Sequence, residues 1–389
     1  MANTLTEVIP QLLAQGLMAL RENAITVQLV NRAYEAMAGM KGSTIDVPIP
    51  SAITVQDVTP AATPATNTHI TPTSVSLVMD QWKEAPFHLT DKEVLEAMDG
   101  TIPMQASEAI KALGNTVDSA VLALYKDIYG FAGTAGTTPF ASSTGSATAI
   151  RKVLNNQLAP LGDRRIIFDA DAEANALNLR AFQDVNFGVT SSDIHEGKVP
   201  KRLGFNFFMN QNTPDHTVGN LGGCAGDLTK VKQEELAGST SILMDVGAVT
   251  NMALLKGDIL VFGGHSQTYV VTANAAGEAT KATAAEVAIN PALTATVAAS
   301  ATVTLKGTAA SAYAQNLAFH RDAFAFASRP LADGMVVNGG SVIASAIDPI
   351  SGLTLRLELT REHKRTRFSY DILYGCKTIR QQLAGRLWG

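Results

Sequence analysis

The stretch from Ser43 to Met79, STIDVPIPSAITVQDVTPAATPATNTHITPTSVSLVM, constrains the fold more than any other part of the chain. Two runs in it alternate apolar and polar residues, Ile45-Val47-Ile49 near its start and Val75-Leu77-Met79 at its end. Residues 43–78 also contain twelve Ser or Thr, five prolines and only two charged residues. Because alternation with a period of two is typical of β-strands, the stretch is predicted to form a long two-stranded arm with an irregular tip.

An arm of this composition needs a surface to lie on. An isolated two-stranded ribbon is marginally stable in water, and one with few charges leaves its backbone edges unprotected against pairing with another chain. The surface can belong to the arm's own domain or to a neighbouring subunit, and the residues alone leave both open.

Apolar residues at spacings of three and four predict several helices. Two N-terminal helices are expected over residues 8–21 and 25–40, and a capping box at Thr90 and Glu93 predicts a short helix ending at Gly100. A longer helix is predicted after Pro103, with an apolar stripe made of Ile110, Leu113, Val117, Val121, Leu124 and Ile128. Helices over 147–158 and 172–179 with a strand at 164–169 indicate an α+β core.

The block from Leu221 to Gly307 has a different composition. It contains one proline and two aromatic residues among many Ala and Thr, and its short alternating runs are separated by turns. This spacing predicts a small all-β unit, a compact barrel inserted into the α+β core. After it, Phe324 and Phe326 alternate with Ala, as in a strand buried on both faces. The chain closes with two alternating strands around a charged turn, within LTLRLELTREHKRTRFSYDILYGCKTI.

Composition bounds the class of protein. A chain of 389 residues with 46% hydrophobic and 6% aromatic residues is expected to fold into two or three domains, or into one large fold with insertions. A net charge of -5 argues against general nucleic-acid binding, which needs clustered Lys and Arg. From Ile350 to Gly389, however, eight basic residues stand against three acidic ones. Because no aromatic stacking platform is interleaved with these charges, they favour a solvated strand face or a subunit contact over a nucleic-acid site.

No arrangement of residues predicts catalysis. His320-Arg321-Asp322 matches the start of a kinase catalytic loop, but Ala327 stands where the metal-binding Asn is needed. GGHSQ around His265 has Thr268 in place of the last Gly of a nucleophile elbow, so it is interpreted as a hairpin turn.

Metal, cofactor and membrane signals are equally weak. The seven histidines form no HExxH or HxxxH pair, the two cysteines are far apart, and no glycine-rich phosphate loop occurs. The N-terminus has no signal-peptide pattern, and no run of eighteen apolar residues occurs. We therefore expect no catalytic residue, metal or cofactor, no enzyme activity, and neither secretion nor a membrane span.

Three phrases carry a resemblance to a known family: VMDQWKEAPFHLTDKEV from Val78, NLAFHRDAFAFASRPL from Asn316 and GLTLRLELTREHKRTRFSYDILYGCKTIR from Gly352. With the long helix between the first two, they resemble the major capsid (coat) proteins of tailed double-stranded DNA bacteriophages. The branch is the one typified by the coat protein of the short-tailed Salmonella phage. The resemblance spans roughly residues 75–380 and implies the α+β Hong Kong 97-type capsid fold with an inserted β-barrel domain.

The resemblance also implies a domain organisation. It assigns an N-terminal helical arm to 1–42, the extended two-stranded loop to 43–90 and a peripheral domain with a spine helix to 91–130. The axial core covers residues 131–220 and the inserted barrel covers residues 221–307. In residues 308–389 the chain passes again through the core and peripheral domains. In the family the extended loop packs on the peripheral domain of an adjacent subunit.

The implied function is that of a major capsid protein in the virion, assembled in the bacterial host cytoplasm. Pentamers and hexamers would form an icosahedral shell around packaged double-stranded DNA, bound without sequence specificity. Partners would be a separate scaffolding protein, a portal protein and a decoration protein, with no membrane. Because no Lys occurs between Lys41 and Lys83, the arm cannot supply the lysine that links subunits in one branch of the fold, so a non-covalent shell is predicted. Alternatives are a non-viral shell or compartment protein of the same fold and, more distantly, a soluble enzyme with a barrel insertion.

Two sets of residues are singled out by this reading. Contacts between subunits are expected from Ile45, Val47, Ile49, Val75, Leu77, Met79 and Trp82. A candidate basic face toward the shell interior consists of Arg361, Lys364, Arg365 and Arg367.

Overall fold

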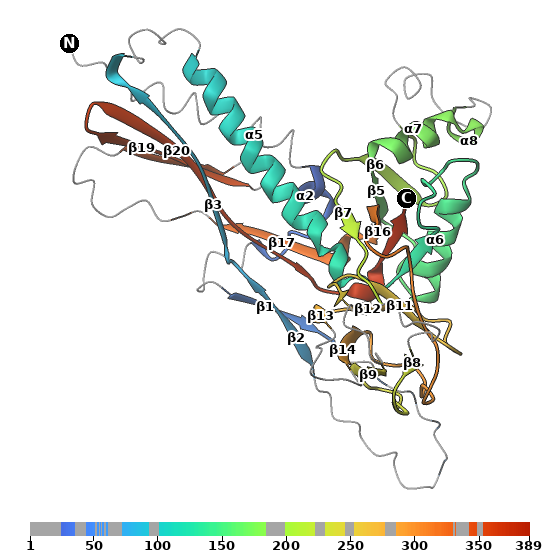
Figure 1. The fold of residues 1–389 in the computed structure, drawn as a ribbon. Coiled ribbons are helices and arrows are strands. Elements are labelled where there is room, and N and C mark those ends of the chain that lie inside the picture. Colours follow the sequence, from blue (N-terminus) through green and yellow to red (C-terminus); the bar gives the residue numbers. More distant parts are fainter. Residues whose placement is uncertain are drawn as a thin grey trace. The chain divides into compact units, whose positions relative to one another are not determined.

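A computed structural model gives the fold of the chain (Figure 1). It describes residues 25–35, 44–50, 53, 55, 57, 60, 72–92, 101–183, 199–221, 230–245, 253–276, 285–329, 331, 342–347 and 353–389. The chain divides into two compact units. Unit 1 comprises residues 1–21, 31–113 and 325–379, and unit 2 comprises residues 22–30, 114–324 and 380–389.

Unit 1 is built on a five-stranded sheet with β20 in its middle. Its strands are β3 (Gln81–Thr90), β17 (Phe324–Arg329), β18 (Val342–Ile347), β19 (Thr354–Glu362) and β20 (Arg365–Thr378). Figure 1 shows β19 and β20 as a long hairpin with β3 beside it, as predicted for the two strands around a charged turn. Leu355, Leu357, Tyr370 and Ile372 form the buried side of the sheet, and Phe87 stacks on Phe368 across β3 and β20 at 5.0 Å.

The arm begins as the predicted hairpin. β1 (Thr44–Ile49) pairs antiparallel with β2 (Thr73–Val78), and Ile45 lies opposite Leu77. One face of this hairpin packs against Ala325, Ala327 and Ile379 of the same unit. Of the two surfaces that the sequence left open, the base of the arm therefore lies on its own domain. β3, which was assigned to the extended loop, is instead a strand of the unit 1 sheet.

A close approach of two backbones fixes the end of this hairpin. A Cβ atom at Gly375 of β20 would lie 2.2 Å from the carbonyl oxygen of Val78, so only glycine fits there without displacement. The arm base is thereby seated directly on the β20 backbone.

The predicted long helix is α5 (Thr101–Leu122), which begins in unit 1 and ends in unit 2. Ile110, Leu113, Val117 and Val121 of the predicted stripe are buried. The helix ends before Leu124, because the chain tightens into the 3-10 turn η1 (Ala123–Asp127) and then extends at Ile128.

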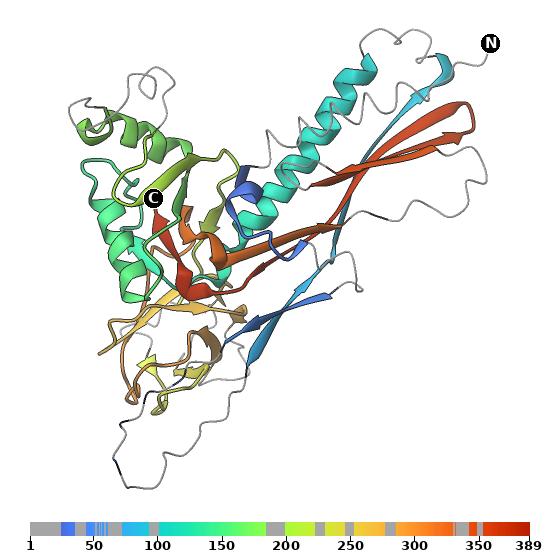
Figure 2. The same cartoon turned by 180° about the vertical axis from the view of Figure 1, so that it is seen from behind.

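Unit 2 contains the predicted α+β core. Its sheet has the order β4-β21-β16-β5-β6, with β7 also pairing with β16. These strands are β4 (Phe131–Gly133), β5 (Arg164–Phe168), β6 (Phe205–Met209), β7 (Asp215–Thr217), β16 (Ala312–His320) and β21 (Ala384–Trp388). The helices are α6 (Gly145–Asn156), α7 (Ala170–Asn178) and α8 (Arg180–Gln183), and α6 packs on β4 and β21 (Figure 2).

The N-terminal helices were predicted less well. The second is α2 (Ile25–Leu29), shorter than the expected span to residue 40. Asp118 accepts a hydrogen bond from the Thr26 amide near its start, and Arg165 donates to the Leu29 carbonyl at its end. These charges complement the helix dipole and fix where the helix stops. The helix expected over 8–21, and residues 93–100 of the one expected to end at Gly100, lie outside the described residues.

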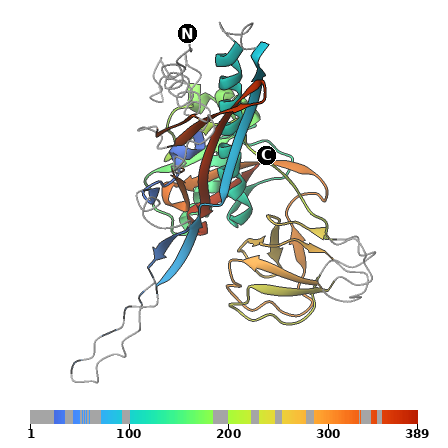
Figure 3. The ribbon, with the colours of Figure 1, turned by 90° about the vertical axis from the view of Figure 1, so that its left-hand side faces the viewer.

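The inserted block forms the predicted barrel, a nearly closed six-stranded sheet of order β15-β11-β12-β14-β9-β8 (Figure 3). The strands are β8 (Lys230–Val231), β9 (Ser241–Asp245), β11 (Ile259–Phe262), β12 (Tyr269–Val271), β14 (Ala285–Asn290) and β15 (Val303–Leu305); β10 (Ala253–Leu254) pairs with β13 (Ala275–Ala276). The Val231 amide donates to the Ala301 carbonyl and draws the two edge strands together. Residues of GGHSQ lie in the turn between β11 and β12, as interpreted from the sequence.

The stretch around the kinase-like triplet connects two buried strands. His320 ends β16, and its Nδ1 accepts a hydrogen bond from the Asp322 amide at 3.2 Å. Arg321–Ala323 form the 3-10 turn η3, after which β17 is buried on both faces as predicted. Among the described helices, none combines the length and the apolar character needed to cross a bilayer.

Candidate assembly surface

The residues expected at subunit contacts separate into two groups. Ile45, Val47, Leu77 and Met79 are buried within unit 1, and Ile49 and Val75 are partly buried against the same cluster. These side chains already have partners inside the chain, so they hold the arm base on its own unit. Trp82 differs, because 61% of its surface is exposed.

The exposed indole of Trp82 is held in one orientation. Its Nε1 donates a hydrogen bond to Oδ2 of Asp371 on the neighbouring strand at 3.0 Å. Arg356 binds the same carboxylate with two of its nitrogens, Nε at 2.9 Å and Nη2 at 2.5 Å. The Arg356 guanidinium also lies 6.0 Å from the centre of the indole ring, within range of a cation–π contact. An immobilised, exposed aromatic side chain is typical of an interface anchor.

Two apolar side chains share the sheet face with Trp82. Leu373 is directly opposite Trp82 in the β3–β20 register. Ile347 of β18 lies opposite Thr354, two residues from Arg356 and therefore on the same face, and 55% of its surface is exposed. We call the face formed by Trp82, Ile347, Leu373 and Arg356 the sheet-face patch.

The arm carries apolar side chains beyond its paired base. Ile53 is 71% exposed and Val55 is 92% exposed. Both continue the odd-numbered alternation of Ile45, Val47 and Ile49, a signal that was present in the sequence but was not used to predict them. Exposed apolar side chains at alternate positions of one segment favour contact with another surface.

The candidate basic face is largely neutralised. Arg361 forms two hydrogen bonds of 2.6 Å with Asp91, Arg367 pairs with Glu84, and Arg365 pairs with Glu362. Lys364 is exposed in the turn, at a φ of 57°. The positive balance was counted along the sequence, whereas the pairing of β3 with β20 brings Glu84 of β3 and Asp91 just after it beside the arginines.

A buried polar network joins the barrel to the core of unit 2. His216 of β7 lies between Tyr125 and Asp258, with its Nδ1 3.0 Å from the Tyr125 hydroxyl and its Nε2 2.9 Å from Asp258. Asp258 also accepts hydrogen bonds from the amides of Gly219 and Leu255. Burial raises the pKa of Tyr125 to about 12, so its hydroxyl keeps its proton.

Arg386 of β21 completes this network. It is fully buried, donates to the Gly257 carbonyl at 2.5 Å, and packs over the Tyr125 ring at 5.5 Å. Burial lowers the pKa of the Arg386 guanidinium to about 10. With both His216 nitrogens bonded within the protein, this cluster is a structural tie between barrel and core. Within the described ranges, no three His, Cys, Asp or Glu side chains gather in a way that could hold a metal ion.

Comparisons with known proteins bear on the fold. No protein-family model matches the sequence, and no curated protein matches it. Among solved structures, a chain from Mycobacterium phage Che8 matches with 14% identity over 93% of this chain and 90% of that chain, at a TM-score of 0.53. The capsid of a native GTA particle matches with 7% identity over 95% of this chain and 90% of that chain, at a TM-score of 0.48. The capsid of cyanophage P-SCSP1u matches with 12% identity over 90% of this chain and 84% of that chain, at a TM-score of 0.44.

The fold assignment rests on the first of these structures and on the strand and helix order above. The short-tailed Salmonella branch stays a prediction, because identities this low establish a shared fold alone. The chain has the α+β Hong Kong 97-type capsid fold, with a nearly closed β-barrel inserted in it.

Proposed function

We propose that this chain is a major capsid protein, which assembles with copies of itself into an icosahedral head shell around packaged double-stranded DNA. The observation that carries the proposal is the arm. Its base packs on its own unit, yet beyond that base Ile53 and Val55 are 71% and 92% exposed. In a capsid fold, a second subunit is the surface that would cover them.

The sheet-face patch supplies a matching surface. Ile53 and Val55 of one subunit pack on Trp82, Leu373 and Ile347 of its neighbour. Burying each large apolar side chain contributes about 1.5–3 kcal/mol before the cost of ordering and association. A single contact of this size is weak, but a shell repeats it many times.

The roles of the two units follow from the same proposal. Unit 1, with its long sheet and the first part of α5, is the peripheral domain, and the core sheet of unit 2 is the axial domain. The arm has no lysine between Lys41 and Lys83, which supports a non-covalent shell. A separate scaffolding protein, a portal protein and a decoration protein are the partners proposed for assembly in the bacterial cytoplasm and for the finished virion.

Expression of the full chain with negative-stain electron microscopy tests the proposal. We expect closed shells or ring-shaped capsomers from the purified protein. A protein that stays monomeric at high concentration, with and without a co-expressed scaffolding protein, contradicts it. Shells that form in cells around protein cargo, with no DNA-packaging partner, point instead to a compartment protein of the same fold.

A further inference from the structure

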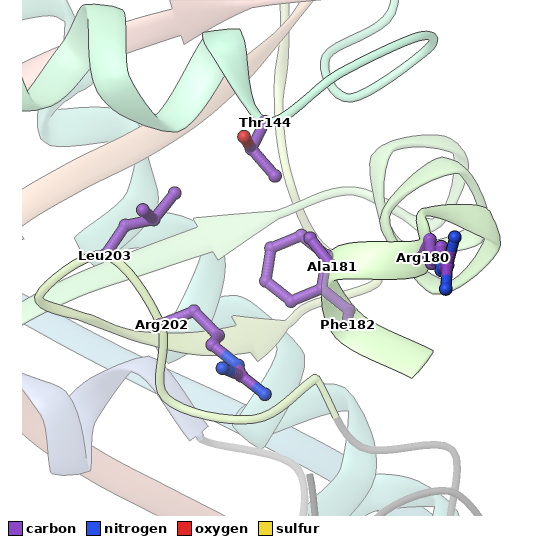
Figure 4. A pocket seen from close by; sticks show the side chains of 6 residues that line it. All are labelled: Thr144, Arg180, Ala181, Phe182, Arg202 and Leu203. Carbon is purple, nitrogen blue, oxygen red and sulfur yellow. The ribbon is translucent and has the colours of Figure 1, made fainter. Parts of the chain in front are cut away.

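A pocket of about 460 Å³ opens in unit 2 between α8, the start of α6 and the turn before β6 (Figure 4). Phe182 lies inside it and is itself buried, because it packs edge-on against Phe140 and Phe207 at 6.2 and 5.4 Å. The lining residues are Thr144, Arg180, Ala181, Phe182, Arg202 and Leu203. One wall of the pocket is therefore part of a packed aromatic cluster.

Among the described residues that line this pocket, the charged ones are Arg180 and Arg202. Nη2 of Arg202 is shielded from solvent and has no hydrogen-bond partner within the described parts of the chain. Arg180 lies at the other end of the pocket (Figure 4). A guanidinium that has a nitrogen without an acceptor favours pairing with an anionic group, and a carboxylate is the group that Arg binds best.

Leu203 is held at the rim of the pocket in a strained conformation. It has a φ of 52° and lies in a tight turn. In this turn the Arg202 amide donates to the Phe205 carbonyl, and the Phe205 amide donates to the Arg202 carbonyl. Asn or Gly is favoured in such a turn, and a leucine is uncommon there. Arg151 secures the turn by donating to the Leu203 carbonyl at 2.6 Å. Backbone strain kept in place by its surroundings is a pointer to a functional surface.

The barrel carries a loop with the complementary chemistry. Leu236 is 66% exposed, and Glu234 beside it is exposed without a partner among the described residues. Glu235 is used within the barrel, because its side chain accepts from the Leu243 amide. Ser239 donates to the Leu236 carbonyl at 3.1 Å and Gly238 to the Leu293 carbonyl at 2.7 Å, so the loop has a fixed shape.

We propose that the pocket receives the Glu234–Leu236 loop of a second copy of this chain. Leu236 enters the hollow against Phe182 and Leu203, and the Glu234 carboxylate accepts hydrogen bonds from Arg202. The inference rests on the proposed function, since it adds a second contact between shell subunits, from the barrel of one to the core of the next.

Charge reversal tests the ion pair. Arg202→Glu and Glu234→Arg alone are each expected to raise the protein concentration needed for assembly by about tenfold, the loss typical of one interfacial charge pair. The double variant Arg202→Glu/Glu234→Arg restores assembly. Arg321→Glu, at an exposed arginine outside the pocket, is the matched control and leaves assembly unchanged. A double variant no better than either single one overturns the pairing, provided circular dichroism shows that all variants are folded.

Cross-linking tests the contact directly. In a Cys224→Ser/Cys376→Ser background, Ala181→Cys with Ala237→Cys is treated with a short bis-maleimide. A ladder of covalent multimers is expected, whereas Ala237→Cys with Gln382→Cys, an exposed position outside the pocket, gives none. Intact shells without a ladder overturn this inference and leave the proposed function standing. If soluble protein gives covalent multimers but never forms shells, the contact between copies is confirmed and the proposed function is overturned.

Discussion

Trp82 Nε1 donates to Asp371 Oδ2 at 3.0 Å, across two strands whose residues are 289 positions apart in the sequence. This hydrogen bond orients an indole that is mostly exposed to solvent. The ion pair between Arg356 and Asp371 in turn positions the carboxylate that accepts the bond. The side chain's conformational entropy is thus lost during folding rather than on association, which favours binding.

Trp82→Ala is therefore expected to impair assembly and not folding. A central interface tryptophan contributes about 2 kcal/mol or more to binding, whereas an exposed substitution changes monomer stability by about 0.5 kcal/mol. Sedimentation velocity measures the first effect and thermal unfolding the second. Leu158→Ala, at an exposed leucine of unit 2, is the control. Equal assembly by the Trp82→Ala variant and the control would remove Trp82 from the interface.

Gly375→Ala is expected to loosen the arm base. The added Cβ would lie 2.2 Å from the Val78 carbonyl oxygen, so the β1–β2 hairpin must shift, at a cost of about 1–3 kcal/mol. Limited proteolysis should cut the arm faster in this variant. Gly162→Ala, where an added Cβ meets nothing within 4 Å, is the control and should behave as the parent protein.

His216→Ala is expected to destabilise the joint between barrel and core. The substitution leaves Asp258 buried with one partner fewer, and breaking a buried pair of this kind costs about 3–5 kcal/mol. Hydrogen exchange should rise in the barrel strands together with the loss of stability in urea. His88→Ala, at an exposed position of β3, is the matched control. An unchanged rate of hydrogen exchange in the barrel strands would mean that apolar contacts alone hold the barrel on the core.

Tyr370→Phe is expected to stabilise the protein. The Tyr370 hydroxyl is buried and has no hydrogen-bond partner among the described residues, a state that costs about 1–3 kcal/mol. Burial also raises its pKa from 10.0 to about 12. Because the unfolded chain loses this proton first, this group leaves stability unchanged below pH 10 and lowers it as pH rises from 10 toward 12.

Denaturant unfolding at pH 7 and pH 11 tests both effects. The parent protein should lose more stability between these pH values than the Tyr370→Phe variant. Tyr125→Phe is the contrast, because that hydroxyl is bonded to His216 and its loss should destabilise at pH 7. A destabilised Tyr370→Phe variant would show that the hydroxyl has an acceptor.

The sequence predicted those parts of the fold whose signal is local. The β19–β20 hairpin, α5, the barrel and the doubly buried β17 were all anticipated, because each shows its own period of apolar residues. Contacts that depend on how distant strands pair with each other were not predicted. Trp82 was predicted to lie at a subunit contact, but its hydrogen-bond partner Asp371 depends on how β3 pairs with β20.

The same dependence on distant residues explains two features that the sequence did not show. In the candidate basic face, which also contains Lys364, Arg367 pairs with Glu84 of β3, Arg361 with Asp91 just after β3, and Arg365 with Glu362. The helix expected to continue to residue 40 stops at Leu29, where Arg165 binds its last carbonyl groups. The pairs of Arg361 and Arg367 and the end of this helix depend on residues more than a hundred positions away, which no local pattern contains.

An electron cryomicroscopy reconstruction of the purified assembly tests the central claim most directly. We predict a closed shell in which Ile53 and Val55 of one subunit cover Trp82 of the next. A compact monomer whose Trp82 stays in solvent at high concentration, with its own arm as its only neighbour, would contradict it.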